Sequence, residues 1–399
     1  MSSSKPVVVY GASGYTGRLV CEYLREYGLP FVASGRSSDR IERAMDHNVP
    51  GIETAGHEVV AVDHSADALA DLFTGAKVVC NTVGPFARYG HAVVEACLEA
   101  GCHYVDTTGE QDWVMECDET YGERMAEKGL LLCPGLAQMY TTGEIAANIC
   151  LETPGLDTLD ILVFWKGSPT IASTQTIFVN AALAKAYYLE QNAYVEWPAD
   201  GGLYDVTVPD QHQTGLALPW GGTSHPVWFR RDPRVANVRA LGGLFDRQLM
   251  QGVPQIVGAV VEKIQDLPDE EKYRVLSEQA SAVMSEMPPR EYQRMNISLD
   301  SVHATGPLGH VHCVLKGTCN YKQTGLMQAY GAYHLANGAP RRVGFASACQ
   351  AFGHRELLGV LQSFGLMAAP ELSGNPNPTA LQPPAAAIGA VAARALVAQ

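Results

Sequence analysis

The sequence lacks any hydrophobic run long enough to cross a membrane. No stretch reaches the roughly 18 apolar residues that a membrane helix needs. The nearest candidates are residues 249–264, interrupted by Pro254, and residues 384–397. We expect both to form packed helices, with an interfacial surface patch as the alternative. Residues 1–6 contain no apolar stretch either, so we expect no secretory signal and a cytoplasmic location.

Cysteine pairs and metal-binding motifs are also missing. The ten cysteines are scattered singly, without a C-x-x-C, and several fall at positions of apolar periodicity, namely Cys21, Cys80, Cys97 and Cys133. We therefore expect buried, reduced thiols and no metal site. The chain has no H-E-x-x-H, G-x-S-x-G or Walker lysine motif. This leaves metalloprotease, serine hydrolase and nucleoside triphosphatase functions without support.

Basic charge is scarce as well. The 28 lysines and arginines against 42 aspartates and glutamates give a formal net charge of −14 and a pI near 5.3. This balance argues against nucleic acid or an anionic membrane surface as a partner. We expect a small-molecule substrate instead, and a homodimer is left open. At 399 residues the chain exceeds what one core usually supports, so we expect two domains.

Short β-branched runs alternate with helical patterns through the first third of the chain. The predicted strands are residues 7–10, 31–33, 59–62, 78–80, 104–105 and 130–133. Continuous apolar strands separated by helices, such as residues 90–100, indicate a parallel sheet that is covered on both faces. The fold class is therefore α/β, with an N-terminal Rossmann domain built on a doubly wound parallel sheet.

After Gly135 the sequence pattern changes to longer predicted loops and more aromatic residues. We expect a Rossmann domain over residues 1–140, an α+β substrate domain over 141–324, and C-terminal helices over 325–399 that return to the Rossmann domain. The predicted elements beyond residue 140 are strands at 158–165 and 310–318, a solvated helix start at 265–272, helices at 326–335 and 356–366, and a loose connector at 375–384. Because one predicted strand alternates apolar and polar residues, the second sheet is expected to be partly antiparallel with one wet face.

A glycine-rich turn directly after the first predicted strand is the most informative motif. It comprises Gly11, Ser13, Gly14, Tyr15, Thr16 and Gly17. The first glycine permits a tight turn, the second lets the backbone approach a pyrophosphate, and the third lets the following helix pack closely. The helix N-terminus then points at the phosphates. The motif predicts a dinucleotide cofactor.

The end of the second strand favours NADP over NAD. Arg36 and Ser37 stand where an NAD site usually presents a carboxylate to the ribose. A basic and hydroxyl-bearing pair can hold a 2′-phosphate instead; the alternative is a solvent-facing loop arginine. Asp63, after the third strand, is placed to contact the adenine edge or to cap the next helix.

Two further strand ends supply polar groups at the same edge of the sheet. After the fourth strand, Gly84 and Pro85 would fix a turn close to the cofactor, next to Val83, while Asn81 and Thr82 could bond the ribose or the nicotinamide. The alternative is a purely structural turn.

The fifth strand ends in Asp106-Thr107-Thr108-Gly109-Glu110 and brings two carboxylates to the nicotinamide side. Asp106 is expected to contact the cofactor. Either carboxylate could donate a proton or clamp the substrate; helix capping by Asp106 or Thr108 is the competing interpretation.

No tyrosine is followed four positions later by lysine, which disfavours the short-chain dehydrogenases. The stretches that are present resemble the saccharopine dehydrogenase-like oxidoreductases, and within them the trans-acting enoyl reductase branch. These stretches are Gly11 to Arg18, Gly35-Arg36, Asn81 to Phe86 with Tyr89-Gly90, and Tyr104 to Glu110. The similarity is dense over residues 6–145 and returns over 344–353. It implies an NADP-binding Rossmann domain, an α/β substrate domain and returning C-terminal helices, and it leaves the substrate open.

Two mechanisms compete within this family. In the first, NADPH delivers hydride to an activated C=C bond of an apolar enone or enoyl substrate, and Tyr89, Glu110 or Tyr140 supplies the hydrogen bond that stabilises the oxyanion. In the second, a saccharopine-like amine is oxidised to an imine, and cationic side chains hold its carboxylates. The available cations, Arg230, Arg231, Arg234 and Arg239, are expected on a surface loop.

The aromatic and methionine content of the middle of the chain favours the first mechanism. A non-catalytic NADP-binding or lipid-associated protein remains a third reading, because fold does not fix function.

Overall fold

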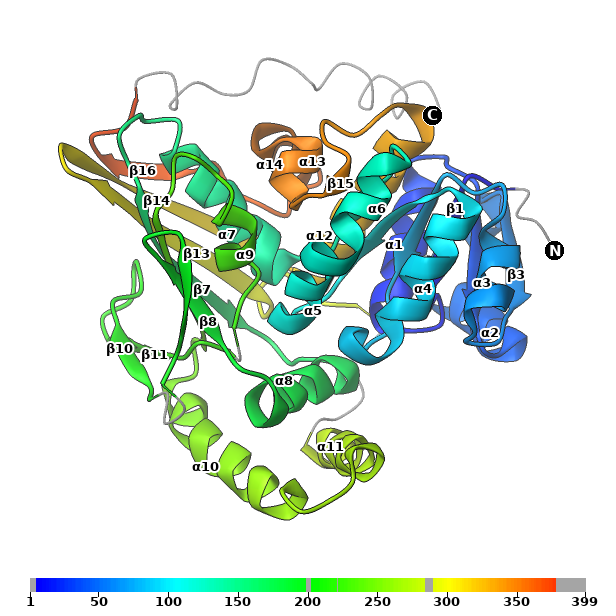
Figure 1. The fold of residues 1–399 in the computed structure, drawn as a ribbon, viewed down its shortest axis with the longest axis horizontal. Coiled ribbons are helices and arrows are strands. Elements are labelled where there is room, and N and C mark those ends of the chain that lie inside the picture. Colours follow the sequence, from blue (N-terminus) through cyan, green and yellow to red (C-terminus); the bar gives the residue numbers. More distant parts are fainter. Residues whose placement is uncertain (1–4, 199–201, 221, 284–289, 378–399) are drawn as a thin grey trace.

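A computed structural model describes residues 5–198, 202–220, 222–283 and 290–377, and contains two large sheets with helices between and around them (Figure 1). The first sheet has strand order β15-β6-β5-β4-β1-β2-β3, and every pairing is parallel. Its strands are β1 (Val7–Tyr10), β2 (Phe31–Gly35), β3 (His57–Ala61), β4 (Val78–Asn81), β5 (His103–Asp106), β6 (Leu131–Cys133) and β15 (Gly344–Phe345). The predicted doubly wound fold is confirmed, although the third strand begins two residues earlier than predicted.

Helices cover both faces of this sheet because alternate strand residues enter two different cores. Val7 and Val9 pack with the helices on one face, and Val8 and Tyr10 with those on the other. The first face carries α1 (Tyr15–Glu26), α2 (Ser38–Asn48) and α12 (Asn320–Asn337). The second carries α3 (Ala66–Phe73), α4 (Phe86–Ala100), α5 (Gln111–Glu116), a π-helical turn (Cys117–Tyr121) and α6 (Gly122–Glu127); a 3₁₀ turn (Ile52–Thr54) precedes β3.

The second sheet is mixed, as predicted, with order β16-β14-β13-β7-β12-β8-β9. Among the described strands of this second sheet, only β7 and β12 pair in parallel. The strands are β7 (Thr158–Lys166), β8 (Tyr187–Glu190), β9 (Ala193–Glu196), β12 (Asn237–Leu244), β13 (Ile297–Gly306), β14 (Gly309–Thr318) and β16 (Glu371–Gly374). Helix α7 (Gln138–Cys150) packs on the inner face. A hairpin of β10 (Tyr204–Val206) and β11 (Gly215–Ala217) covers part of the outer face.

The core does not stop at the boundary between the two sheets. One continuous cluster contains Val9 of the first sheet, Val302 of the second, and Leu326 of α12. Helix α12 lies so close to α1 that a Cβ on Gly325 would be 2.8 Å from the Cβ of Leu19. The C-terminal α13 (Ala348–Phe352) and α14 (His354–Ser363) complete this core.

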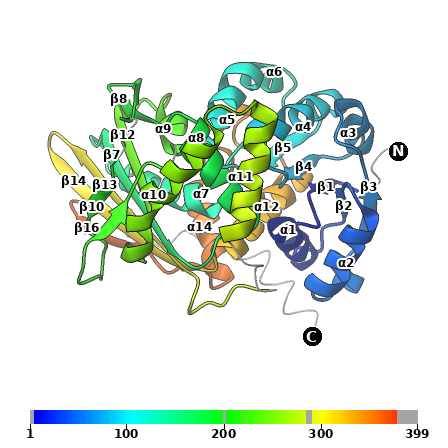
Figure 2. The same ribbon diagram turned by 90° about the horizontal axis from the view of Figure 1, so that it is seen from below.

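Three helices lie together below both sheets (Figures 1 and 2): α8 (Ile171–Leu183), α10 (Arg247–Ile264) and α11 (Asp269–Val283). The predicted packed helix at residues 249–264 is confirmed as α10, which packs against α8 and α11 through Val260 and Ile264. Pro254 lies within it without ending it, and Met250 is its other buried residue. No helix in the described residues is long and apolar enough to span a bilayer. The predicted helix at 384–397 and most of the predicted connector fall outside these residues.

The positions of the cysteine and charged side chains can be compared with what the composition led us to expect. All ten cysteines are buried and free, which confirms the expectation of reduced thiols.

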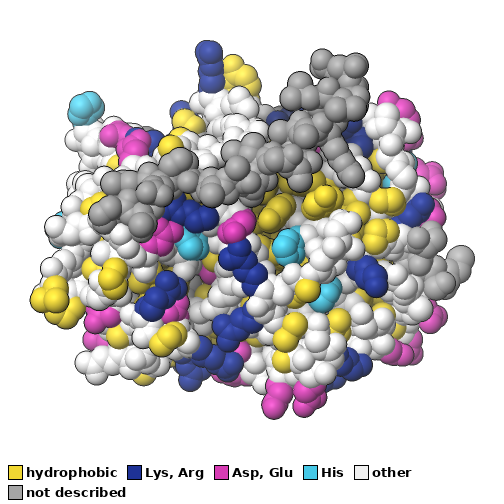
Figure 3. Space-filling model, turned by 90° about the horizontal axis from the view of Figure 1, so that it is seen from above, with side chains coloured by type: hydrophobic (Ala, Val, Ile, Leu, Met, Phe, Trp, Pro, Cys, Tyr) yellow, Lys and Arg dark blue, Asp and Glu magenta, His cyan; other side chains and the backbone are white. Residues whose placement is uncertain are grey.

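On the face seen from above, basic side chains are interspersed with acidic ones (Figure 3). The prediction that four arginines share one surface loop is wrong for Arg239, which lies on β12 and stacks over Tyr188. Arg230 follows the short α9 (His225–Phe229) and stacks over Tyr194.

Asp300, on β13, is fully buried, and neither carboxylate oxygen has a hydrogen-bond partner among the described residues. Burial raises its pKa to about 7, an effect that the nearby Thr142 hydroxyl reduces. Because the folded-state pKa lies above the unfolded value of about 3.9, the stabilisation from Asp300 is present at low pH and is lost as the pH rises through about 7.

We therefore expect Asp300→Asn to raise the free energy of unfolding near pH 8 by ~1 kcal/mol or more, with a smaller gain near pH 5. Urea titrations at both pH values measure this difference, and the exposed Asp266→Asn is the control. An equal gain at both pH values would contradict the burial of an ionising carboxyl at this position.

Candidate functional site

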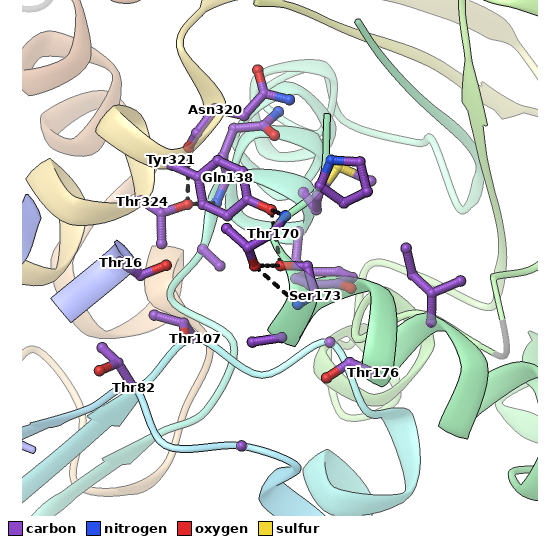
Figure 4. A pocket seen from close by; sticks show the side chains of 18 of the residues that line it. Thr16, Thr82, Thr107, Gln138, Thr170, Ser173, Thr176, Asn320, Tyr321 and Thr324 are labelled. Carbon is purple, nitrogen blue, oxygen red and sulfur yellow. Dashed lines mark hydrogen bonds between the residues drawn. The ribbon is translucent and has the colours of Figure 1, made fainter. Parts of the chain in front are cut away.

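A pocket of about 190 Å³ lies where the carboxyl edge of the first sheet meets the second sheet (Figure 4). The first sheet contributes Thr16 from α1, Thr82 after β4, and Thr107 after β5. The opposite wall comes from the start of α7, the end of β7, α8, and the start of α12. Ligands of doubly wound sheets bind at this carboxyl edge, so the location suits a cofactor and substrate that meet in one place.

The glycine turn has the close backbone approaches that such a cofactor requires. Gly11 has φ +95°, and a Cβ there would lie 2.5 Å from the Thr82 hydroxyl oxygen. A Cβ on Gly17 would lie 2.3 Å from the carbonyl oxygen of Gly11, while Gly14 is exposed. Ser13 and Tyr15 are half-buried beside it. Gly14 is the N-cap of α1, and no side chain caps that helix, so its first amides are available to an anion. The turn therefore fits a pyrophosphate.

The side chains after β2 and β3 lie farther along the same edge. Arg36 is exposed, and the Ser37 hydroxyl accepts a hydrogen bond from the Arg40 amide to cap α2. Asp63 is exposed and has no cap role. The N-cap of α3 is Ser65, whose hydroxyl accepts from the Ala68 amide. The capping interpretation of Asp63 is therefore wrong, and its predicted contact with adenine stays a prediction.

The turn after β4 is held by its own polar groups. Asn81 is fully buried: its Oδ1 accepts from the Val83 amide at 3.0 Å, and its Nδ2 donates to the Tyr104 hydroxyl at 3.0 Å. The Thr82 hydroxyl donates to the Tyr10 carbonyl, and both Thr82 and Gly84 line the pocket. The structure thus differs from the expectation for Asn81, whose amide shapes the turn rather than facing a ligand. Pro85 follows a cis peptide bond and precedes α4.

The Asp106 carboxylate is also engaged by groups inside the protein. It is fully buried, and its carboxylate accepts four hydrogen bonds, from the Thr108 and Gly135 amides, the Tyr104 hydroxyl and the Trp113 indole, at 2.7 to 2.9 Å. The four bonds occupy the lone-pair positions of both oxygens. Asp106 therefore orders the loops after β5 and β6 and is not placed to bind a cofactor, contrary to the expectation.

Glu110 likewise lies behind the pocket wall. Its two oxygens accept from the Phe86 amide at 2.9 Å and the Ala87 amide at 2.7 Å, the first amides of α4. Burial raises its pKa to about 7, against the effect of these two bonds. Glu110 does not line the pocket. Its contacts assign it to holding the start of α4, rather than to the expected proton donation.

Of the two candidate tyrosines, only Tyr140 lines the pocket. Tyr89, in the first turn of α4, packs edge-on against His64, with ring centroids 5.1 Å apart, and does not line the pocket. Tyr140, in the first turn of α7, lines the pocket. Its hydroxyl lies over Gly109, where a Cβ would be 2.0 Å away, and it takes part in none of the hydrogen bonds found among the described residues. Burial raises the pKa of Tyr140, so the phenol is protonated at neutral pH.

Apart from Tyr140, the residues of the opposite wall of the pocket were missed from the sequence. The Tyr321 hydroxyl donates to the Ser173 hydroxyl at 2.9 Å and accepts from the Thr170 amide at 2.8 Å (Figure 4). Thr170, Ser173 and Thr176 face the pocket from the N-cap and first turns of α8. Their three-residue spacing is the signal that could have indicated a hydroxyl-bearing helix face.

The pocket lining carries no charged side chain among the described residues. The lining combines hydroxyl and amide groups with Phe86, Trp165 and Trp220, and the indole N–H of Trp165 is buried without an acceptor among the described residues. An unpaired donor beside a pocket can bond an oxygen of a ligand. The chemistry of this lining suits a neutral, mostly apolar molecule with a hydrogen-bond acceptor.

Known proteins match the two parts of the chain separately. Residues 141–375 match a family of unknown function (DUF5938), and residues 7–130 match the saccharopine dehydrogenase NADP binding domain. A lipid droplet localized protein of Caenorhabditis elegans is 38% identical over 132 residues, 31% of each chain. A trans-acting enoyl reductase of Mycobacterium ulcerans is 34% identical over 126 residues, 31% of this chain and 30% of that one. The match thus spans about a third of the length of these relatives.

A solved structure extends the likeness of the fold to nearly the whole chain. Saccharopine dehydrogenase (L-Glu forming) of Saccharomyces cerevisiae aligns with a TM-score of 0.59 over 93% of this chain and 100% of that one, at 11% sequence identity. The resemblance inferred from the sequence is therefore confirmed for the fold and for the NADP-binding domain. A cytoplasmic location and a homodimer stay predictions.

Proposed function

Because the chain belongs to the DUF5938 family and carries a saccharopine dehydrogenase NADP binding domain, we propose that it is an NADPH-dependent reductase of activated C=C bonds. Its substrates would be uncharged and largely apolar enones or enoyl compounds. The observation that carries the proposal is the pocket at the carboxyl edge of the first sheet, whose described lining has aromatic rings and hydroxyls but no charge.

The residues that would hold the cofactor follow from the edge of the first sheet. The glycine turn and the uncapped start of α1 would take the pyrophosphate, and Thr82 and Thr107 lie beside the pocket. NADPH bound there would supply the hydride. Tyr140 would hydrogen-bond the substrate carbonyl and donate the proton that the α-carbon takes up, since it lines the pocket and its hydroxyl has no hydrogen bond among the described residues. The Trp165 indole could supply a second bond to the same oxygen.

A saccharopine-like amine substrate fits this pocket less well. Its carboxylates would require cationic partners, and burying a carboxylate without one is costly. The arginines that could have served are engaged elsewhere: Arg231 pairs with Asp118, Arg234 with Asp232, and Arg239 stacks over Tyr188. None of them lines the pocket.

The test is a substrate panel with the purified full chain. We expect oxidation of NADPH, followed by its absorbance, with cyclic enones and enoyl esters, and no oxidation with imines that bear carboxylates. Turnover only with the imines would overturn the proposal in favour of C–N chemistry. Binding of NADPH without turnover of any compound would indicate a non-catalytic NADP-binding protein.

A further inference from the structure

His64 lies in a cluster of side chains from separate elements at the adenine end of the carboxyl edge. It belongs to the segment between β3 and α3, and its Nδ1 is 2.8 Å from the Tyr10 hydroxyl at the end of β1. The imidazole lies nearly parallel to the Tyr10 ring, at an angle of 11° and a centroid distance of 6.0 Å. The Tyr89 ring of α4 meets it edge-on. Two neighbouring aromatic rings and a hydrogen bond thus fix the orientation of the imidazole.

Arg36 directly follows β2, close enough to the same cluster for its charge to act on it. Its charge acts on both Tyr10 and His64. β2 lies between β1 and β3 in a parallel sheet, so the residues that follow these three strands meet at one edge. In doubly wound dinucleotide sites, the residue after the second strand contacts the 2′ position of the adenosine ribose. The geometry therefore brings an imidazole close to Arg36, the residue expected at the position that distinguishes NADP from NAD.

We propose that His64 forms, together with Arg36, the binding site for the 2′-phosphate of NADP(H), and that its imidazole takes up a proton when the phosphate binds. The inference rests on the proposed use of NADPH. It assigns Tyr10 a positioning role, since its hydroxyl holds Nδ1 and leaves Nε2 for the phosphate. It also gives Tyr89 a place in the adenine end of the site rather than in catalysis.

The charges around His64 set the direction of the effect. Without a phosphate, burial and the charge of Arg36 both lower the pKa of His64, so the imidazole is neutral at neutral pH. The other titratable groups that face it are Tyr10 and Tyr89; Asp63 precedes it in the chain and is exposed. A 2′-phosphate carries about −1.5 to −2 charges and favours the imidazolium. NADPH should therefore bind more tightly as the pH falls, whereas NADH should not.

The experiment measures dissociation constants for NADPH and NADH by quenching of tryptophan fluorescence between about pH 6.5 and about pH 8.5. For the unaltered protein, we expect NADPH affinity to change by up to about tenfold per pH unit, the limit for one linked proton, and NADH affinity to stay constant. His64→Gln should abolish the pH dependence for NADPH. The matched control is His57→Gln at the opposite end of β3, which should retain it.

Two further variants separate the roles within the cluster. Arg36→Ala should weaken NADPH binding about 10- to 100-fold, and the pH dependence should persist but move to higher pH, because the charge that lowers the pKa of His64 is removed. Tyr10→Phe should reduce the slope, because it removes the bond to Nδ1; it also serves if His64→Gln does not fold. An unchanged slope in His64→Gln, or in Tyr10→Phe when His64→Gln does not fold, would overturn the inference. If NADPH binding depends on pH as expected but no substrate is turned over, only the proposed reductase activity is overturned.

Discussion

Replacing Tyr140 with phenylalanine is expected to lower kcat about 100-fold or more, with little change in NADPH affinity. Two tyrosines line the described pocket, and the Tyr321 hydroxyl is hydrogen-bonded, whereas the Tyr140 hydroxyl has no hydrogen bond among the described residues. Removal of that hydroxyl would leave the developing enolate without its hydrogen bond and its proton source. Steady-state rates with an enone substrate, combined with cofactor titration by fluorescence, measure both quantities.

Tyr321→Phe is the matched control for this prediction. Its hydroxyl lies in the same pocket but is committed to Ser173 and Thr170, so its loss should affect substrate affinity more than kcat. A second variant, Gly109→Ala, should displace the Tyr140 hydroxyl, which lies 2.0 Å from the added Cβ position, and lower kcat without removing the phenol. If Tyr140→Phe leaves kcat intact, the proton must come from another group.

Gly17→Ala is expected to weaken NADPH binding about 10- to 100-fold. The added Cβ would lie 2.3 Å from the Gly11 carbonyl oxygen and 2.9 Å from the Ala12 Cα, both backbone atoms that cannot move without opening the turn. The milder Gly14→Ala, with its nearest contact at 3.2 Å, should cost less. Gly258→Ala, on the open surface of α10, is the control and should leave cofactor binding unchanged. Intact NADPH affinity in a folded Gly17→Ala protein would remove the turn from the cofactor site.

The cofactor half of the site was the part most open to prediction from sequence. Its determinants are local, because the glycine turn and each strand end are short runs of neighbouring residues. The alternation of strands and helices that positions these runs can be read directly from the sequence. The carboxylates were harder to interpret. Asp106 is engaged by Gly135, and Glu110 by Phe86 and Ala87, which are distant in sequence. A carboxylate at a strand end has the same sequence context whether it binds a ligand or orders a loop.

The substrate half could not be predicted for a related reason. Its walls come from α7, α8 and α12, which are far apart in the chain and meet only when the two sheets pack together. Thr170 and Tyr321 are 151 positions apart and still share a hydrogen bond. No local motif encodes such a pairing. The uncharged character of the lining is likewise a property of the assembled pocket.

Helix α12 touches both halves of the site. Its first turns bring Tyr321 and Thr324 to the substrate pocket, and the next residue, Gly325, presses against Leu19 of the cofactor-binding helix α1. A substrate that shifts α12 therefore shifts its contact with α1. By thermodynamic reciprocity, any change that the substrate makes in NADPH affinity must be matched by an equal change that NADPH makes in substrate affinity. If substrate and NADPH bind as proposed, the close approach at Gly325 is a direct contact through which the two sites can be coupled.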